Sequence, residues 1–125
     1  MKLLLDTHVL LWWLDDPDLL TPPARAAIAR DSNAVFVSAA AVWEIAIKKA
    51  LGKLRAPDDL EAVMEEERFQ PLSIAVPHAL ALASLPSVHQ DPFDRIQVAQ
   101  AQLESLTLVT RDTRLQQYGV PYIDA

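Results

Sequence analysis

The segment KLLLDTHVLLWWL, residues 2–14, carries two different apolar patterns, one directly after the other. Residues 2–6, KLLLD, form a short apolar run that ends in an acid, which is typical of a buried strand. Residues 7–14, THVLLWWL, space their apolar side chains as an amphipathic helix does. The segment therefore predicts a strand followed at once by a helix, with Asp6 at the junction.

The same alternation recurs along the whole chain. Further apolar runs predict strands, the last of them weak, at residues 34–38, 69–74, 106–110 and 121–125. Helices are predicted between them at residues 22–30, 39–51, 58–68, 76–85, 92–104 and 112–119. Strands that alternate with helices form a mainly parallel sheet with helices on both faces, so we expect an α/β protein.

The composition indicates one domain over residues 1–125. A chain of 125 residues, 51% of them hydrophobic and only two of them glycine, can bury its own core. It has no cysteine, which excludes disulfides and thiolate metal sites and fits a reducing cytoplasm. No apolar stretch reaches the length of a membrane span. We therefore expect a cytoplasmic protein without a membrane partner.

The net charge of −6 argues against a protein that binds nucleic acid through a general basic excess. It does not exclude a nuclease, because a cluster of metal-binding carboxylates lowers the net charge by itself. Basic residues concentrate at Lys48, Lys49, Lys53 and Arg55, and acidic residues concentrate between residues 58 and 67. The simplest interpretation of both runs is a solvated helix face.

Four acids stand at informative positions. Asp6 and Asp112 each follow a predicted strand, Glu44 lies within the helix after the second strand, and Asp94 lies one turn into the long helix. Singly, each has a structural explanation. Asp6, Asp94 and Asp112 suit the first turn or cap of a helix. Glu44 can pair with Lys48, four residues on, at an exposed helix face.

Together, the four acids favour a common site. Ligands of open α/β sheets bind at the carboxyl ends of the strands, where Asp6 and Asp112 would meet if their strands are neighbours. Glu44 lies in the apolar run AAAVWEIAI and can face the same edge. Converging carboxylates repel one another, and a divalent cation with oxygen ligands, Mg²⁺ or Mn²⁺, neutralises them. Such a site suits phosphoryl chemistry.

Two threonines adjoin these acids. Thr7 follows Asp6, and Thr110 precedes Asp112 by two residues. Their hydroxyls could bond a metal-bound water or a phosphate oxygen, or they could cap the helices that follow.

Four blocks in order, LLLDTHVLLW, SAAAVWEIAIKKALGKL, HQDPFDRIQVAQA and LTLVTRD, resemble the PIN domain and, more closely, the VapC-type toxins of bacterial toxin–antitoxin pairs. The resemblance runs from about Lys2 to Ile123. It implies a three-layer α/β/α fold with a parallel sheet of about five strands in the order 3-2-1-4-5, in which the first and fourth strands are neighbours. By position, Asp6, Glu44 and Asp94 match the family's core acids, and Asp112 matches its more variable fourth.

The resemblance also implies the function. Family members are endoribonucleases that cleave RNA with a water activated by one or two Mg²⁺ or Mn²⁺ ions. They usually form homodimers, and a small antitoxin inhibits them by laying its tail along an apolar groove. Lys48, Lys49 and Lys53 are then candidates for holding the RNA backbone. The region of Trp12 and Trp13 is a candidate docking surface for the antitoxin.

The motif HQDPFDR, residues 89–95, is similar to one branch of the family. Asp91 could be an outer-shell acid of the metal site, but we expect it to be the N-cap of the helix, with Pro92 in its first position. Arg95 is expected to contact phosphate or to pair with a neighbouring acid. His89 is expected to be a surface or packing residue.

Two alternative functions remain open at the level of sequence. The first is a haloacid-dehalogenase-like phosphatase with Asp6 as a phosphorylated nucleophile, but that family has a second Asp two residues later, where this chain has His8. The second is a PIN fold that binds RNA or protein without catalysis. The presence of all four acids counts against it.

Overall fold

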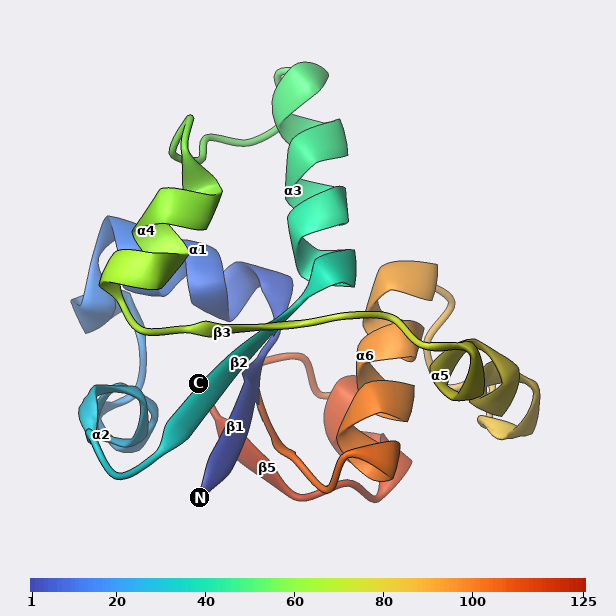
Figure 1. Ribbon diagram of the computed structural model, residues 1–125. Helices are drawn as coiled ribbons and strands as arrows, with labels where there is room; N and C mark the ends of the chain where they lie inside the picture. Colours follow the sequence, from blue (N-terminus) through green and yellow to red (C-terminus); the bar gives the residue numbers. More distant parts are fainter.

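The computed structural model describes residues 1–125 and contains one sheet of five parallel strands (Figure 1). The strands lie in the order β3-β2-β1-β4-β5. Their bounds are Lys2–Leu5 for β1, Ala34–Ser38 for β2, Gln70–Leu72 for β3, Thr107–Thr110 for β4 and Tyr122–Asp124 for β5. The expected fold class and strand order are therefore confirmed.

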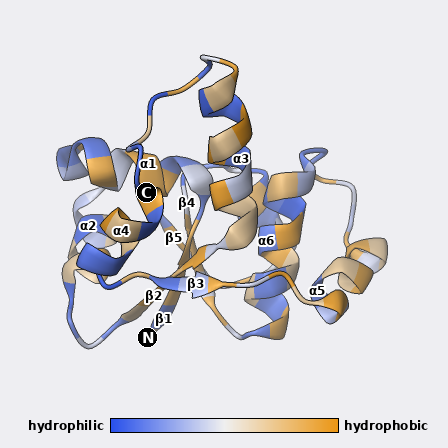
Figure 2. Ribbon diagram, turned by 45° about the horizontal axis from the view of Figure 1, so that its top comes forward, coloured by the Kyte–Doolittle hydropathy of each residue, from blue (hydrophilic) through white to orange (hydrophobic).

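Six α-helices connect the strands. Their bounds are Thr7–Asp15 for α1, Pro22–Ala29 for α2, Ala39–Ala50 for α3, Leu60–Glu66 for α4, Val76–Ala81 for α5 and Pro92–Leu103 for α6. Figure 2 shows that they carry both hydrophobic and hydrophilic residues, as amphipathic helices do. None of them combines the length and the apolar character that crossing a bilayer would require.

The two faces of the sheet have separate cores. Along β1, Leu3 and Leu5 face a core that includes residues of α1, α2, α3 and α4, whereas Leu4 faces a core that includes residues of α6, of β4 and of the segment after β4. All three leucines are fully buried. This alternation is the period of two that a strand imposes on its side chains, and it produces the three layers.

Two predicted helices are shorter than the sequence pattern indicates. The helix predicted over residues 76–85 ends as α5 at Ala81 and continues as a 3₁₀ turn, Leu82–Ser84. The guanidinium of Arg95 donates hydrogen bonds to the backbone carbonyls of Leu82 and Leu85. These bonds compete with the hydrogen bonds of a continuing α-helix. The segment predicted over residues 112–119 is helical only as a 3₁₀ turn, Leu115–Tyr118, which Gly119 ends with a φ of +81°.

The register of the sheet positions the acids. Leu5 of β1 lies opposite Val109 of β4, and the backbone N–H of Asp6 donates to the carbonyl of Val109 at 3.1 Å. Asp6, which precedes α1, therefore lies beside the end of β4. Asp112 follows two residues after that end. The carboxyl ends of the two central strands bring these acids to one edge.

Candidate active site

Asp6 is buried at the junction of β1 and α1, with 5% of its surface exposed. Its Oδ1 accepts a hydrogen bond from the backbone N–H of Val9 at 2.8 Å, which makes it the N-cap of α1. Burial raises its pKa, although hydrogen bonds from the Thr110 side chain and the Val9 backbone act in the opposite direction. The prediction that Asp6 caps a helix is confirmed, and its carboxyl group also lies near the other acids.

Glu44 is also buried, with 2% of its surface exposed. Its Oε1 accepts a hydrogen bond from the hydroxyl of Thr7 at 2.7 Å, and its Oε2 forms an ion pair with Lys48. The hydrogen bond to Glu44 raises the pKa of Lys48. The predicted pair with Lys48 therefore exists, but the expectation of an exposed helix face is wrong: the apolar neighbours of Glu44 carry it inward to the sheet edge.

Asp94 lies in the first turn of α6, behind the N-cap Asp91. The Oδ1 of Asp91 accepts from the N–H of Phe93 at 2.8 Å, as the sequence predicts. Burial first, and then the charges of Asp91, Asp6, Glu44 and Asp112, raise the pKa of Asp94 to about 7. Acids from three other elements thus act on one carboxyl group, so the structure brings the four predicted acids near one another.

Asp112 differs from the other three because basic groups surround it. The guanidinium of Arg114 contacts Oδ1 at 3.2 Å and Oδ2 at 3.1 Å, and the backbone N–H of Arg114 donates to Oδ1 at 2.9 Å. Partial burial acts to raise the pKa of Asp112, but the hydrogen bonds from Arg114 and His89 outweigh it, and the pKa is lowered. Asp112 is the acid of the four whose charge the protein itself compensates most.

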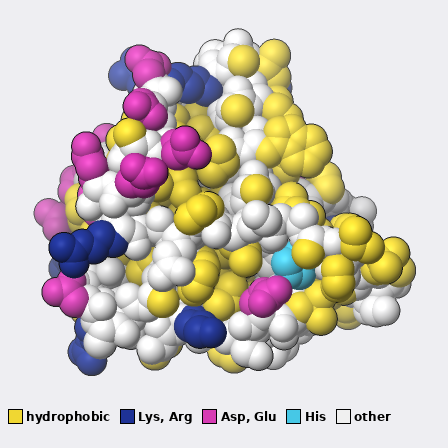
Figure 3. Space-filling model, in the orientation of Figure 1, with side chains coloured by type: hydrophobic (Ala, Val, Ile, Leu, Met, Phe, Trp, Pro, Cys, Tyr) yellow, Lys and Arg dark blue, Asp and Glu magenta, His cyan; other side chains and the backbone are white.

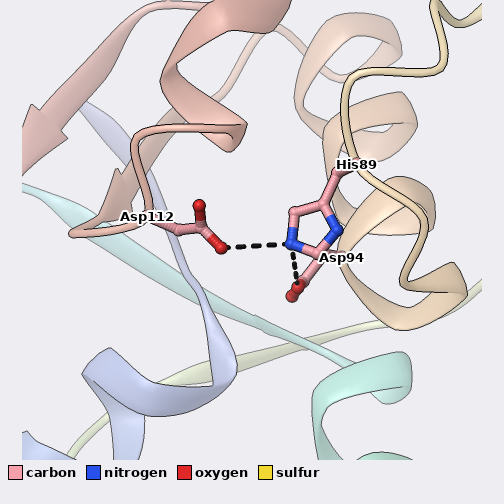
Figure 4. Close-up of side chains that lie close together, drawn as sticks. All are labelled: His89, Asp94 and Asp112. Atoms are coloured by element: carbon pink, nitrogen blue, oxygen red, sulfur yellow. Dashed lines mark hydrogen bonds and ion pairs between the residues drawn. The ribbon is translucent and has the colours of Figure 1, made fainter.

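His89 joins two of these acids, contrary to the expectation of a surface or packing residue. Only 5% of its surface is exposed, and Nε2 lies 3.0 Å from Oδ2 of Asp94 and 3.1 Å from Oδ2 of Asp112 (Figure 4). The potential ligand atoms of the three residues lie within 4.8 Å of one another. The spacing of residues 89, 91 and 94 could have indicated this contact, because a helix cap at Asp91 turns the chain so that residue 89 faces residue 94.

The threonines orient the acids. The hydroxyl of Thr7 donates to Glu44 and lies 3.5 Å from Nε2 of the buried Gln97, a residue that the sequence pattern did not single out. Thr110 bonds Asp6 and accepts from the N–H of Asp112 at 3.1 Å. Contact of either hydroxyl with a metal-bound water or a phosphate stays a prediction.

Arg95 forms no ion pair with an acid, so that part of the expectation is wrong; a contact with phosphate stays a prediction. Its guanidinium donates to backbone carbonyls, including Pro86 at 2.9 Å and Leu82 at 3.1 Å, and to the hydroxyl of Tyr118 at 3.3 Å. Arg95 therefore holds the loop that precedes α6, from which His89 projects.

Two of the three candidate RNA-binding lysines are already paired. Lys48 binds Glu44, and Lys49 lies 2.6 Å from Asp58. Lys53 is exposed and forms no ion pair. A contact of these lysines with RNA stays a prediction.

The donor set fits a hard divalent cation. Lys48 and Arg114 are the two permanently charged groups that pair with the four carboxylates, and burial together with the nearby acids raises the pKa of Asp94 to about 7. Carboxylate oxygens without full compensation are the ligands that Mg²⁺ and Mn²⁺ prefer. A cation at this edge would relieve the repulsion that raises the pKa of Asp94.

Replacing Asp94 by Asn should stabilise the metal-free protein above neutral pH. The pKa of about 7 in the folded chain lies above the ordinary 3.8, so ionisation of Asp94 opposes folding. The penalty grows as pH rises from about 4 to about 7 and is complete above that. We expect Asp94→Asn to raise the free energy of unfolding by about 1–3 kcal/mol at pH 8, with little change at pH 4.

Urea unfolding in EDTA at both pH values measures this difference. The exposed Asp31→Asn is the matched control and should change stability little at either pH. An equal free energy of unfolding for Asp94→Asn and the wild type at pH 8 would show that the acids do not repel one another in the fold.

Comparison with known proteins agrees with this architecture. The sequence pattern of the PIN domain family matches residues 3–121. Ribonuclease VapC22 of Mycobacterium tuberculosis (strain ATCC 25618 / H37Rv) is 29% identical over 121 residues, which are 94% of this chain and 92% of that protein.

Solved structures share the fold. A chain in the crystal structure of VapBC2 from Rickettsia felis bound to a DNA fragment from their promoter has a TM-score of 0.73 at 12% identity, over 99% of this chain and 98% of that one. FitAcB from Neisseria gonorrhoeae gives a TM-score of 0.65 at 22% identity, over 98% and 96% of the two chains. Since the family pattern spans almost the whole sequence, the protein belongs to the PIN domain family.

Proposed function

We propose that the protein is a Mg²⁺- or Mn²⁺-dependent endoribonuclease and the toxin of a toxin–antitoxin pair. The observation that carries the proposal is the convergence of Asp6, Glu44, Asp94 and Asp112 at the carboxyl edge of the sheet, where burial and the charges of the other acids raise the pKa of Asp94 to about 7. The similarity to Ribonuclease VapC22 and to chains of VapBC complexes supports the same activity. A cytoplasmic location is part of this proposal.

In this proposal Asp6, Glu44 and Asp94 hold the cation, and Asp112 completes the site. Bound there, one or two divalent ions activate water and stabilise negative charge on the oxygens around phosphorus. The chain's own contribution is to fix the ligands beforehand. Val9 and Thr110 orient Asp6, and Thr7 and Lys48 orient Glu44. Side chains fixed by hydrogen bonds lose little freedom when they bind.

Removal of the charge of Glu44 tests the proposal. The change Glu44→Gln keeps the shape of the side chain and should lower Mn²⁺-dependent RNA cleavage by at least about 100-fold, because loss of a ligand costs no less than loss of its outer hydrogen-bond partners. The assay follows a mixture of cellular RNAs by primer extension, which locates cleavage sites in whichever RNA is the target. Glu66→Gln, on the exposed face of α4, is the control and should cleave as the wild type does.

The outcomes separate the alternatives. Cleavage that survives Glu44→Gln would contradict the nuclease assignment. A haloacid-dehalogenase-like phosphatase would hydrolyse a phosphate monoester in both variants. A PIN fold without catalysis would bind RNA and cleave none, even as the wild type with Mn²⁺.

The proposal includes a protein inhibitor that carries apolar and basic side chains. A cavity of about 290 Å³ between α3 and α4 is lined mainly by apolar residues, with Glu61 and Glu65 among its walls. A second hollow, of about 450 Å³, adjoins Trp12. An antitoxin tail with apolar anchors suits such hollows, and a basic residue suits the acidic edge. A neighbouring short reading frame for a DNA-binding protein would support this partner.

A homodimer is the remaining part of the proposal. Trp43, Ile47 and Leu51 form an exposed apolar stripe along α3, and Val76 and Leu80 are exposed on α5. Figure 3 shows hydrophobic side chains along this right-hand side of the molecule, whereas Asp and Glu gather over α4. Apolar patches without charge are typical of obligate contacts between copies of a chain.

A charge in this stripe should separate the subunits. We expect light scattering to give about twice the chain mass of 13.9 kDa for the wild type and the mass of one chain for Ile47→Asp. Ala26→Asp, exposed on α2, is the control and should remain dimeric. A wild-type protein with the mass of one chain would contradict the dimer, as would a dimer that Ile47→Asp leaves intact.

A further inference from the structure

His89 has its tautomer fixed by the backbone. The N–H of Asp91 donates to Nδ1 of His89 at 3.1 Å, so Nδ1 must present a lone pair. In a neutral imidazole the proton is then on Nε2. That nitrogen forms a hydrogen bond with Oδ2 of Asp112 at 3.1 Å and lies 3.0 Å from Oδ2 of Asp94 (Figure 4). One ring nitrogen therefore contacts two carboxylates.

The loop that carries His89 holds the ring in place. The backbone N–H of His89 donates to the hydroxyl of Tyr118 at 2.9 Å, and the carbonyl of His89 accepts from Arg95 at 3.3 Å. Arg95 also binds Tyr118 and the carbonyl of Pro86. These contacts come from α6, which carries Asp94, and from the 3₁₀ turn after β4, which follows Asp112 in the chain.

This arrangement decides between two roles for the imidazole. A metal ligand would need its lone pair on Nε2 and its proton on Nδ1, and that proton would then meet the N–H of Asp91. We infer that His89 is a positioning residue: its Nε2–H bonds Asp112 after β4, and the same nitrogen contacts Asp94 of α6, so that the two carboxylates are placed before a cation binds. The inference rests on the proposed metal site, because the positioning of the carboxylates matters for function only if a cation binds there. The tautomer itself does not depend on RNA cleavage.

The partners of the carboxylate oxygens of Asp94 and Asp112 support this positioning role. Both oxygens of Asp112 are bonded to Arg114, and one of them also to His89. For Asp94 the contact to His89 uses Oδ2 only, and Oδ1 forms no hydrogen bond within the protein. Asp94 can therefore keep its contact with His89 through one oxygen and offer the other to a cation. A histidine bonded to a ligand in this way acts on the metal from outside its coordination shell.

Imidazole ¹⁵N–¹H correlation spectra of the wild-type protein test the inference directly. His78 is an internal reference for the same tautomer, because its Nδ1 accepts from the N–H of Ala75 at 2.9 Å and its Nε2 lies 2.9 Å from Glu104. The exposed His8 is the reference for a ring without such bonds. The change His89→Gln assigns the third ring.

We expect a protonated Nε2 and an unprotonated Nδ1 on His89, in EDTA and at saturating Mg²⁺ alike. A proton on Nδ1 in either state, or loss of the proton from Nε2 when Mg²⁺ is added, would overturn the inference and make His89 a ligand. The spectrum decides this even if the protein cuts no RNA.

Affinity for Mn²⁺ alone, measured by calorimetry, gives the second readout. His89→Gln keeps an N–H donor at about the reach of Nε2 and should bind Mn²⁺ within about threefold of the wild type. His89→Leu has no donor and should bind about 10-fold or more weakly, as loss of an outer-shell partner does. Equal weakening in both variants would overturn the positioning role. A wild type that binds no Mn²⁺ would contradict the proposed function instead, while the NMR result would still stand.

Discussion

Parallel pairing of β1 with β4 is the constraint on which the site depends. It sets the carboxyl ends of two neighbouring strands at one edge, so that Asp6 and the residues after Thr110 lie beside each other. The helices that follow β2 and precede β4 bring Glu44 and Asp94 to the same edge. Four like charges then meet where the chain buries at least two of them almost completely. Such an arrangement opposes folding unless opposite charge or hydrogen bonds compensate it.

The protein compensates each acid differently. Glu44 has an ammonium and a hydroxyl, and Asp112 has a guanidinium and an imidazole. Asp6 has the N-terminus of α1, whose free N–H groups favour an acid. Asp94 has only the contact with Nε2 of His89, and burial together with the neighbouring acids raises its pKa to about 7. In the proposed function, a divalent cation would relieve the remaining repulsion.

Much of this arrangement was predictable from sequence because it depends on local patterns. Apolar runs predicted the strands, and helical spacing predicted the helices between them. The caps at Asp6 and Asp91 follow from rules that act within four residues. The order of the strands came from the family resemblance, since spacing alone does not say which parallel strands are neighbours.

The parts that the sequence did not reveal depend on contacts between distant segments. The orientation of His89 requires Tyr118, 29 residues further along the chain, and the position of Arg95 relative to the loop before α6. The burial of Glu44 requires the packing of α3 on α1 and α6, which lets Thr7 reach it over 37 residues. The sequence shows the charge of Arg95, which suggested a contact with phosphate. It does not show the backbone carbonyls to which Arg95 donates hydrogen bonds.

Anomalous diffraction from crystals grown with excess Mn²⁺ tests the central claim most directly, because it locates the ion without any assumption about substrate. The account predicts a peak at the carboxyl edge of the sheet, in contact with carboxylate oxygens of Asp6, Glu44 and Asp94, with Nε2 of His89 outside the coordination shell. An empty edge, or Mn²⁺ bound only elsewhere on the surface, would contradict the claim that these four acids form one metal site.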